Sequence, residues 1–260
     1  MSGFQNSPGP ITPDSAPDPA RRIITLLFKG LAGLTVVIIL LVAAVLFVLL
    51  PRSYMKNTRM PTRLKWKALS EKMISEKASK IFKDTDLAAA EAGFQPVSTY
   101  SATGPAYYKP EAKIYLSPDS RTALINECFW ILQEINCQRT LSTYFQDGRQ
   151  VMTSNIDYQF NMPEPDWRLF HSDPGYKNLG AQYQDHLKAV EKITAAGGVP
   201  TALTEENLES TVTAFQDKIS QWRSEHGILE RVPGQDEYQM TYRMALDRIL
   251  SGLRKGPGKK

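Results

Sequence analysis

Several side chains that could bind a ligand or move a proton lie close together in the segment 157–178. In order along the chain they are Asp166, Trp167, Arg168, His171 and Asp173. An aromatic ring beside a guanidinium or a carboxylate can line a groove for a small molecule or a peptide, which makes the first three the candidate ligand-binding residues. An imidazole near a carboxylate can exchange a proton or hold a cation, so His171 and Asp173 are the catalytic candidates.

The segment itself predicts a loop of about 22 residues, with three prolines and five aromatic residues. Loops of this length inside a compact domain are usually functional or disordered, and the aromatic content argues against disorder. A structural interpretation stays open, in which the aromatic rings fill the open end of a sheet and the acidic side chains are solvated.

The rest of the chain holds few residues of catalytic type. The other histidines are His186, predicted on a solvated or capping position of a helix, and His226, predicted at a core or helix-end position. The sequence has no glycine-rich nucleotide loop, no GxSxG, no HExxH and no CxxC. We therefore predict no metal site and no cofactor.

An uncharged apolar run, Gly30–Leu50, predicts a membrane-spanning helix within residues 23–51. Its 21 residues would extend about 31 Å as a helix, which matches a hydrocarbon core of about 30 Å. A cleaved signal peptide is the main alternative, but its apolar region is normally shorter and is followed by small residues at a cleavage site. Leu-Leu-Pro-Arg follows here.

Basic side chains follow the apolar run without an acid among them. They are Arg52, Lys56, Arg59, Arg63, Lys65 and Lys67, with Trp66 between the last two. Such a strip next to a spanning helix predicts contact with anionic headgroups, and Trp66 suits headgroup depth. Lys and Arg near a span also tend to stay in the cytoplasm. Because the amino-terminal flank carries only three cations, we expect the soluble domain on the cytoplasmic side of an inner or plasma membrane.

The net charge of +4 is unevenly distributed. Residues 52–83 hold ten Lys and Arg against two acids, whereas residues 84–260 hold eighteen against twenty-three. A nucleic-acid-binding domain usually has a basic face on its folded part, so nucleic acid is not an expected partner. The expected partners are a bilayer with anionic headgroups and an unknown protein.

The two cysteines, Cys128 and Cys137, leave two states open. They would be free thiols in a reducing compartment and could pair in an oxidising one.

The pattern along the chain divides it into five parts. We predict a disordered proline-rich tail over 1–22, the membrane helix over 23–51, and a basic juxtamembrane helix over 52–83. A globular α+β domain over 84–253 and a frayed basic tail over 254–260 complete the chain.

Period-two apolar patterns predict a four- or five-stranded antiparallel meander between Phe94 and Asn155. Asp147-Gly148 predicts a two-residue hairpin turn within it. The LSPD turn and the FQDG hairpin together resemble bacterial proteins of uncharacterised function, and this resemblance implies no activity or site.

Apolar residues at helical spacing predict three carboxyl-terminal helices, over about 179–196, from a cap at Thr204 to Gly227, and over about 235–252. Strands followed by helices predict an α+β fold with the helices on one face of the sheet. The favoured function is a non-enzymatic binding or scaffolding module at the membrane surface. The alternative is a membrane-tethered enzyme of unrecognised type that uses the 157–178 loop.

Overall fold

The computed structural model describes residues 19–57, 59–62, 65–70, 73–103, 110–131, 134–156 and 163–255. Most of the proline-rich tail, Arg63, residues 157–162 of the candidate loop and the last five residues of the basic tail lie outside this set. The chain forms two compact units, one up to Pro51 and one from Arg52 onward.

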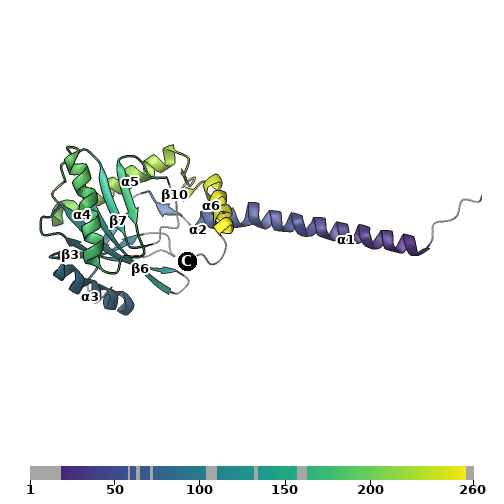
Figure 1. Ribbon diagram of the computed structural model, residues 1–260, viewed down its shortest axis with the longest axis horizontal. Helices are drawn as coiled ribbons and strands as arrows, with labels where there is room; N and C mark the ends of the chain where they lie inside the picture. Colours follow the sequence, from purple (N-terminus) through teal and green to yellow (C-terminus); the bar gives the residue numbers. More distant parts are fainter. Residues whose placement is uncertain are drawn as a thin grey trace, which may run out of the picture. The chain divides into compact units, whose positions relative to one another are not determined.

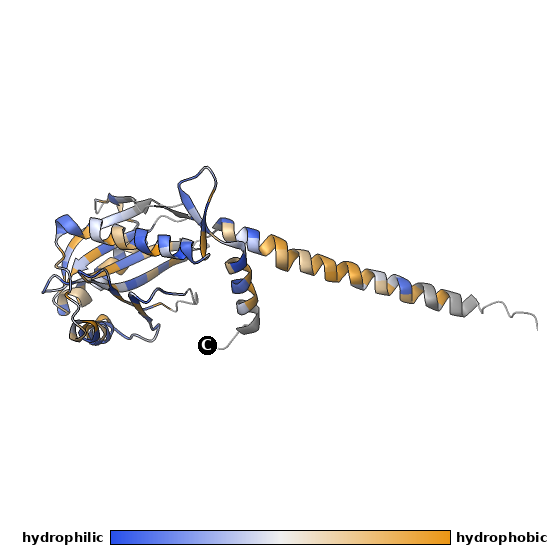
Figure 2. Cartoon of the chain, turned by 90° about the horizontal axis from the view of Figure 1, so that it is seen from above, coloured by the Kyte–Doolittle hydropathy of each residue, from blue (hydrophilic) through white to orange (hydrophobic). Residues whose placement is uncertain are grey.

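The amino-terminal unit is helical throughout its described length (Figure 1). Helix α1 (Pro19–Ala44) runs into a π-helical turn, η1 (Val45–Leu49), and helix α2 (Leu50–Asn57) follows. Apart from Lys29 and Thr35, the side chains between Leu27 and Leu50 are apolar, and they are largely exposed (Figure 2). Within the described chain, Leu27–Lys56 is the one helix long and apolar enough to cross a membrane. The first residues of the predicted disordered tail to be described, from Pro19, already belong to this helix.

The predicted continuous juxtamembrane helix over 52–83 is interrupted by two strands: its two ends lie in α2 and in helix α3 (Glu76–Glu91), and the strands lie between them. Strand β1 (Met60–Pro61) and strand β2 (Lys65–Ala68) come before α3. Trp66 on β2 pairs with Ala102 on β3, so the backbone of β2 finds its hydrogen-bond partners in the sheet. Tertiary pairing therefore overrides the helical spacing of the apolar residues.

The main sheet has seven strands rather than four or five. The strands flanking the predicted meander are β2 and β8 (Arg168–Ser172), and the order is β2-β3-β4-β5-β6-β7-β8. The middle five strands lie within the predicted span from Phe94 to Asn155: β3 (Gln95–Thr103), β4 (Glu111–Leu116), β5 (Thr122–Ile131), β6 (Glu134–Tyr144) and β7 (Gln150–Ser154). All neighbours are antiparallel except β7 and β8, which are parallel.

Helices cover both faces of this sheet, which corrects the prediction of a single covered face. On one face, α3 and helix α4 (Leu179–Ala195) pack on a cluster that includes Phe94, Leu124 and Leu141. On the other face, helix α5 (Glu205–Glu225) packs through Leu208 and Val212 on a cluster made of Ile114, Leu116, Ala123, Tyr144 and Leu203. Because successive strand residues point to opposite faces, β4, β5 and β6 each supply residues to both clusters.

The third predicted helix begins later than expected. Residues 229–240 form strands β9 (Leu229–Arg231) and β10 (Glu237–Met240), so Tyr238 lies in a strand. They make a small antiparallel sheet in the order β1-β10-β9. Helix α6 follows over Tyr242–Lys255 and includes the first two residues of the predicted frayed tail. Thr204 caps α5 as predicted, with Asn207 completing a reciprocal capping box.

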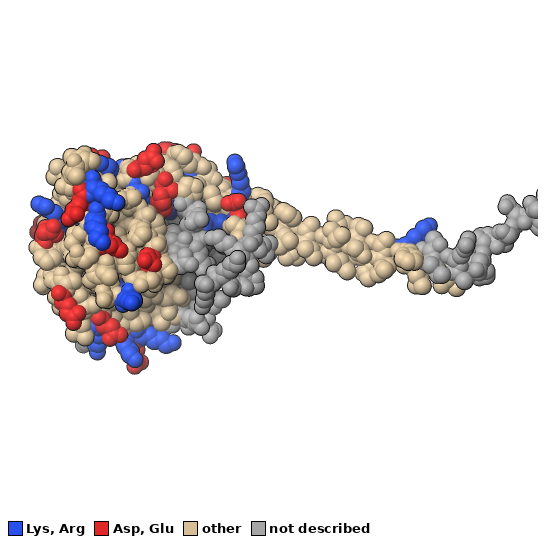
Figure 3. All heavy atoms as spheres, in the orientation of Figure 1, with Lys and Arg blue, Asp and Glu red and all other residues tan. Residues whose placement is uncertain are grey.

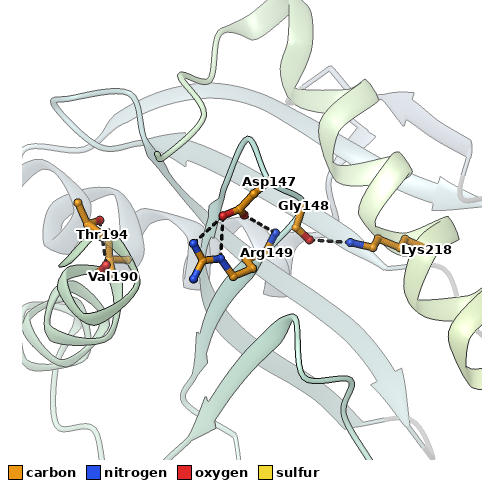
Figure 4. A network of polar contacts seen from close by, with 6 residues as sticks. All are labelled: Asp147, Gly148, Arg149, Val190, Thr194 and Lys218. Atoms are coloured by element: carbon orange, nitrogen blue, oxygen red, sulfur yellow. Dashed lines mark hydrogen bonds and ion pairs between the residues drawn. The ribbon is translucent and has the colours of Figure 1, made fainter. Parts of the chain in front are cut away.

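The hairpin between β6 and β7 has a three-residue loop instead of two (Figure 4). The amide of Phe145 donates to the carbonyl of Arg149 at 2.9 Å, and only Gly148 in the turn has a positive φ, +81°. This is the geometry of a turn followed by one left-handed residue, for which glycine is the favoured choice. Asp147 and Arg149 close the turn with an ion pair at 2.6 Å, and Arg149 lowers the pKa of Asp147.

Candidate functional site

The predicted 157–178 loop contains strand β8, so its candidate residues occupy fixed places on a sheet. The backbone carbonyl of Trp167 accepts from the amide of Gln150 at 2.9 Å, and the amide of Asp173 donates to Ser154 at 3.0 Å. Between these two bonds, β8 runs parallel to β7. Side chains along a strand alternate between its faces, so Arg168 and His171, three residues apart on β8, are directed to opposite faces.

On the α5 face, Arg168 forms a nearly buried ion pair. Its Nη1 lies 2.7 Å from a carboxylate oxygen of Glu164, and the side chain of Arg168 is 8% exposed. Glu164 also accepts from Nη2 of Arg223 on α5 at 3.0 Å. The guanidinium of Arg168 lies 5.5 Å from the ring of Phe170. Glu164 thereby joins β8 to α5, and Arg168 has a structural partner already.

Trp167 lies between α5 and the β6–β7 hairpin. Nζ of Lys218 is 4.1 Å from the centre of the Trp167 ring and donates to the carbonyl of Gly148 at 2.7 Å (Figure 4). Phe215 meets the same indole edge to face, with ring centres 6.3 Å apart. A cation over an indole and a T-shaped ring pair both stabilise packing. The half-buried Trp167 thus closes the α5 side of the sheet.

The remaining candidates lie toward α4 or in solvent. His171 is exposed, with its ring 6.2 Å from that of Tyr176. Asp173 accepts from the amide of Gly175 at 2.7 Å and so closes a local turn. Burial, together with Asp185 and Asp173, raises the pKa of Tyr176 to about 12. Asp166 is exposed.

The five candidates therefore do not converge on one place. Arg168 and Trp167 pack toward α5, whereas His171 lies on the opposite face of β8. The described residues include no group of three or more His, Cys, Asp or Glu side chains that could hold a metal ion.

A buried polar seam beneath α4 is the feature that the sequence interpretation missed. His186, predicted at a solvated or capping position, is fully buried. Its Nε2 and Nδ1 each lie 2.9 Å from a threonine hydroxyl, Thr143 on β6 and Thr153 on β7. The hydroxyl oxygen of Thr122 on β5 lies 2.8 Å from that of Thr143, so the series of hydrogen bonds reaches a third strand.

The spacing of residues along α4 could have predicted this buried polar seam. Gln182 and His186 fall three and seven residues after the buried Leu179, on the same helical stripe. Nε2 of Gln182 donates to the carbonyls of Arg139 and Thr153, at 3.0 and 3.1 Å. Polar residues on a helical stripe can therefore be core residues when the facing strands supply hydroxyls and carbonyls. Burial lowers the pKa of His186 to about 3.

His226 lies at a helix end, one of the two positions predicted for it. It is the C-cap residue of α5, where its Nδ1 lies 2.8 Å from the carbonyl of Trp222 and its ring stacks on that indole.

The proposed membrane-surface residues divide into two sets. Arg52 and Lys56 on α2 and Lys67 on β2 are exposed, and Lys65 is in β2. Two others are engaged inside the domain. Arg59 lies 3.8 Å from Glu237 and donates to Gln235 at 3.0 Å. The half-buried Trp66 packs edge to face on Tyr100 and against the α5-side core.

Helix α6 brings further cations to the same end of the domain. Arg248 on α6 makes a side-chain hydrogen bond with Tyr54 on α2. Ala245 is buried, whereas Arg243 and Asp247 are exposed, so α6 has a packed side and a solvated side. The sequence of α6 also ends in Arg254 and Lys255.

A search of protein-family models, of curated proteins and of solved structures finds no match to this chain.

Proposed function

We propose that this protein is a single-pass membrane protein whose folded domain is a non-enzymatic binding or scaffolding module at the membrane surface. An apolar helix whose side chains stay exposed within the chain needs an apolar solvent, and a bilayer supplies it. The domain that follows is a compact unit with its own cores.

The observation that carries the surface role is the hydrogen bond between Tyr54 and Arg248. It fastens α6 to α2, the helix that directly continues the apolar run. Arg52 and Lys56 on α2 and Arg243 on α6 are exposed cations, and this bond joins the two helices that carry them. We call the exposed cations of α2 and α6 the basic collar; they are Arg52, Lys56 and Arg243.

Anionic headgroups are the partner that this collar fits. A cation near an anionic leaflet contributes about 1 kcal/mol of binding. The rest of the domain offers a different surface: in Figure 3, Lys and Arg side chains alternate with Asp and Glu on the face in view. A surface of mixed charge is not the continuous basic face that nucleic acid requires, so it favours lipid bound at the basic collar as the partner.

The candidate residues of the 157–178 segment support the non-enzymatic interpretation. Arg168 is already paired with Glu164, Asp173 holds a turn, and His171 lies on the other face of the strand. A protein partner would bind the surface of mixed charge, and the membrane helix would keep the complex at the membrane.

The side of the membrane is the point on which two observations differ. The flanking charges favour a cytoplasmic domain in an inner or plasma membrane. A disulfide between Cys128 and Cys137 favours an oxidising compartment instead.

The test uses fragment 52–260, which corresponds to the second compact unit. We expect it to bind liposomes containing anionic lipid, to bind neutral liposomes weakly, and to lose affinity as salt rises. Arg52→Gln combined with Arg243→Gln should weaken binding to anionic liposomes. The matched control, Arg121→Gln with Lys192→Gln, removes two exposed charges elsewhere and should not.

Two outcomes would contradict the proposal. One is equal binding to neutral and anionic liposomes. The other is binding to duplex DNA at physiological salt as tight as binding to anionic liposomes.

A further inference from the structure

Two cysteines face each other across the longest hairpin of the main sheet. Cys128 on β5 and Cys137 on β6 are directly opposite partners in the register, and a disulfide joins them. Their Cα atoms are 4.1 Å apart, close to the spacing of about 4.5 Å for an antiparallel pair without backbone hydrogen bonds. In such a pair the side chains leave the sheet on the same face at short distance. The strand register alone therefore brings the two sulfur atoms together.

The disulfide belongs to the interior of the domain. Cys128 is 1% exposed and shares a cluster with Ala78 and Phe82 of α3. The half-buried Cys137 and Ile135 pack on the same cluster. Since α3 covers this part of the hairpin, the bond is part of the core and differs from the exposed, exchangeable pairs of redox enzymes.

We infer that residues 52–260 fold on the oxidising side of the membrane, with the amino-terminal tail in the cytoplasm. The inference rests on the proposed function in that the apolar helix directs the chain to a membrane. Closure of the bond takes two protons and two electrons from the two thiols. A disulfide-donor protein of the oxidising compartment accepts them and becomes a dithiol. In the cytoplasm, thiol reductants would keep both cysteines reduced.

This orientation is the reverse of the one that the flanking charges favour. The cations of the amino-terminal tail are nevertheless consistent with a tail that stays in the cytoplasm. Arg21, Arg22 and Lys29 precede the apolar run, and a short tail with three cations resists translocation. Long loops and domains are translocated across membranes largely regardless of their charge.

Thiol trapping on the full-length chain tests the inference. Cells are lysed in N-ethylmaleimide so that every thiol present in the cell is capped. The membranes are then denatured, treated with or without dithiothreitol, and labelled with polyethylene-glycol maleimide. We expect two labels per chain after reduction and none without it. The single variant Cys128→Ser, whose remaining thiol is capped at lysis, should take no label in either lane. No label on the native chain after reduction would overturn the inference.

A second measurement is independent of the cysteines. A reporter that is active only outside the cytoplasm, fused after Lys260, should be active in the native chain and in the Cys128→Ser/Cys137→Ser variant. A silent reporter in the native chain would also overturn the inference. An active reporter recovered in the soluble fraction would leave the orientation intact and refute the membrane anchor of the proposed function instead.

Discussion

Nε2 of His186 on α4 lies 2.9 Å from the hydroxyl oxygen of Thr143 on β6. A neutral imidazole has one N–H donor and one acceptor, and a hydroxyl can serve either role, so Thr143 and Thr153 satisfy both ring nitrogens without an ion. The seam therefore holds α4 to the sheet in the uncharged state of His186. Protonation would place a positive charge in the core.

The first prediction is that acid weakens the domain through His186. Burial lowers the pKa of His186 to about 3 in the folded protein, against an ordinary value of 6.5. The stabilising contribution is full above pH 6.5 and is lost as the pH falls toward 3, because the unfolded chain takes up the proton first. The loss approaches about 1.4 kcal/mol per pH unit. The free energy of unfolding of the native chain and of His186→Gln, measured by urea at several pH values, should converge as the pH falls. A constant difference between them would refute the assignment.

The second prediction concerns the β6–β7 turn. Gly148→Val should lower the free energy of unfolding by about 1–3 kcal/mol relative to Gly148→Asn. Both variants place a Cβ against Nζ of Lys218, 2.9 Å away, so that contact is matched. They differ in how they tolerate the φ of +81°, which asparagine adopts far more readily than a β-branched residue. Thermal unfolding of fragment 52–260 gives the comparison, and equal stability of the two variants would show that the turn geometry is wrong.

The third prediction separates a buried ion pair from an exposed one. Glu164→Gln removes the carboxylate shared by Arg168 and Arg223, and should cost about 2–3 kcal/mol of stability. Asp185→Asn breaks the exposed pair with Lys188 and should cost less than about 0.5 kcal/mol. Urea unfolding of the two variants tests this. A loss for Glu164→Gln no larger than for Asp185→Asn would mean that Arg168 is free to serve another partner.

The fourth prediction is that the disulfide stabilises the domain. Replacement of Cys128 and Cys137 by serine should cost about 2–3 kcal/mol, as expected when a crosslink closes a short loop. The native fragment should lose a similar amount in dithiothreitol, whereas the double-serine variant should not respond. A native fragment indifferent to the reductant would contradict the bond.

The central strands and the helices α4 and α5 could be predicted because their own residues carry the pattern. Leu141 and Val151, for example, are buried core residues in alternating segments. The two outer strands could not be predicted in this way. β2 is four residues long, and its pairing with β3 decides its conformation. β8 runs parallel to β7 and reaches it by a crossover, and the local sequence of β8 does not indicate which strand it pairs with.

The candidate site was less predictable than the fold. Residue types near one another in the sequence, such as Arg168 and His171, indicated a shared site, but the alternation of a strand sent them to opposite faces. The prediction for His186 was wrong because its hydroxyl partners lie far away in the sequence. They are on β6 and β7, 43 and 33 residues before it. Hydrogen bonds between residues this far apart cannot be predicted from a short stretch of the sequence.

The pairing of β1 with β10 sets the order in which the chain can fold as it is made. Thr62 donates to the carbonyl of Asp236, a partner 174 residues further along. The segment that leaves the ribosome directly after the apolar helix must therefore wait for nearly the whole domain to be synthesised before it finds its strand partner. Loop closure over that distance comes late. The residues that directly follow the apolar helix in the sequence are then among the last to assemble, and a chain that stops before β10 would leave β1 without its strand partner.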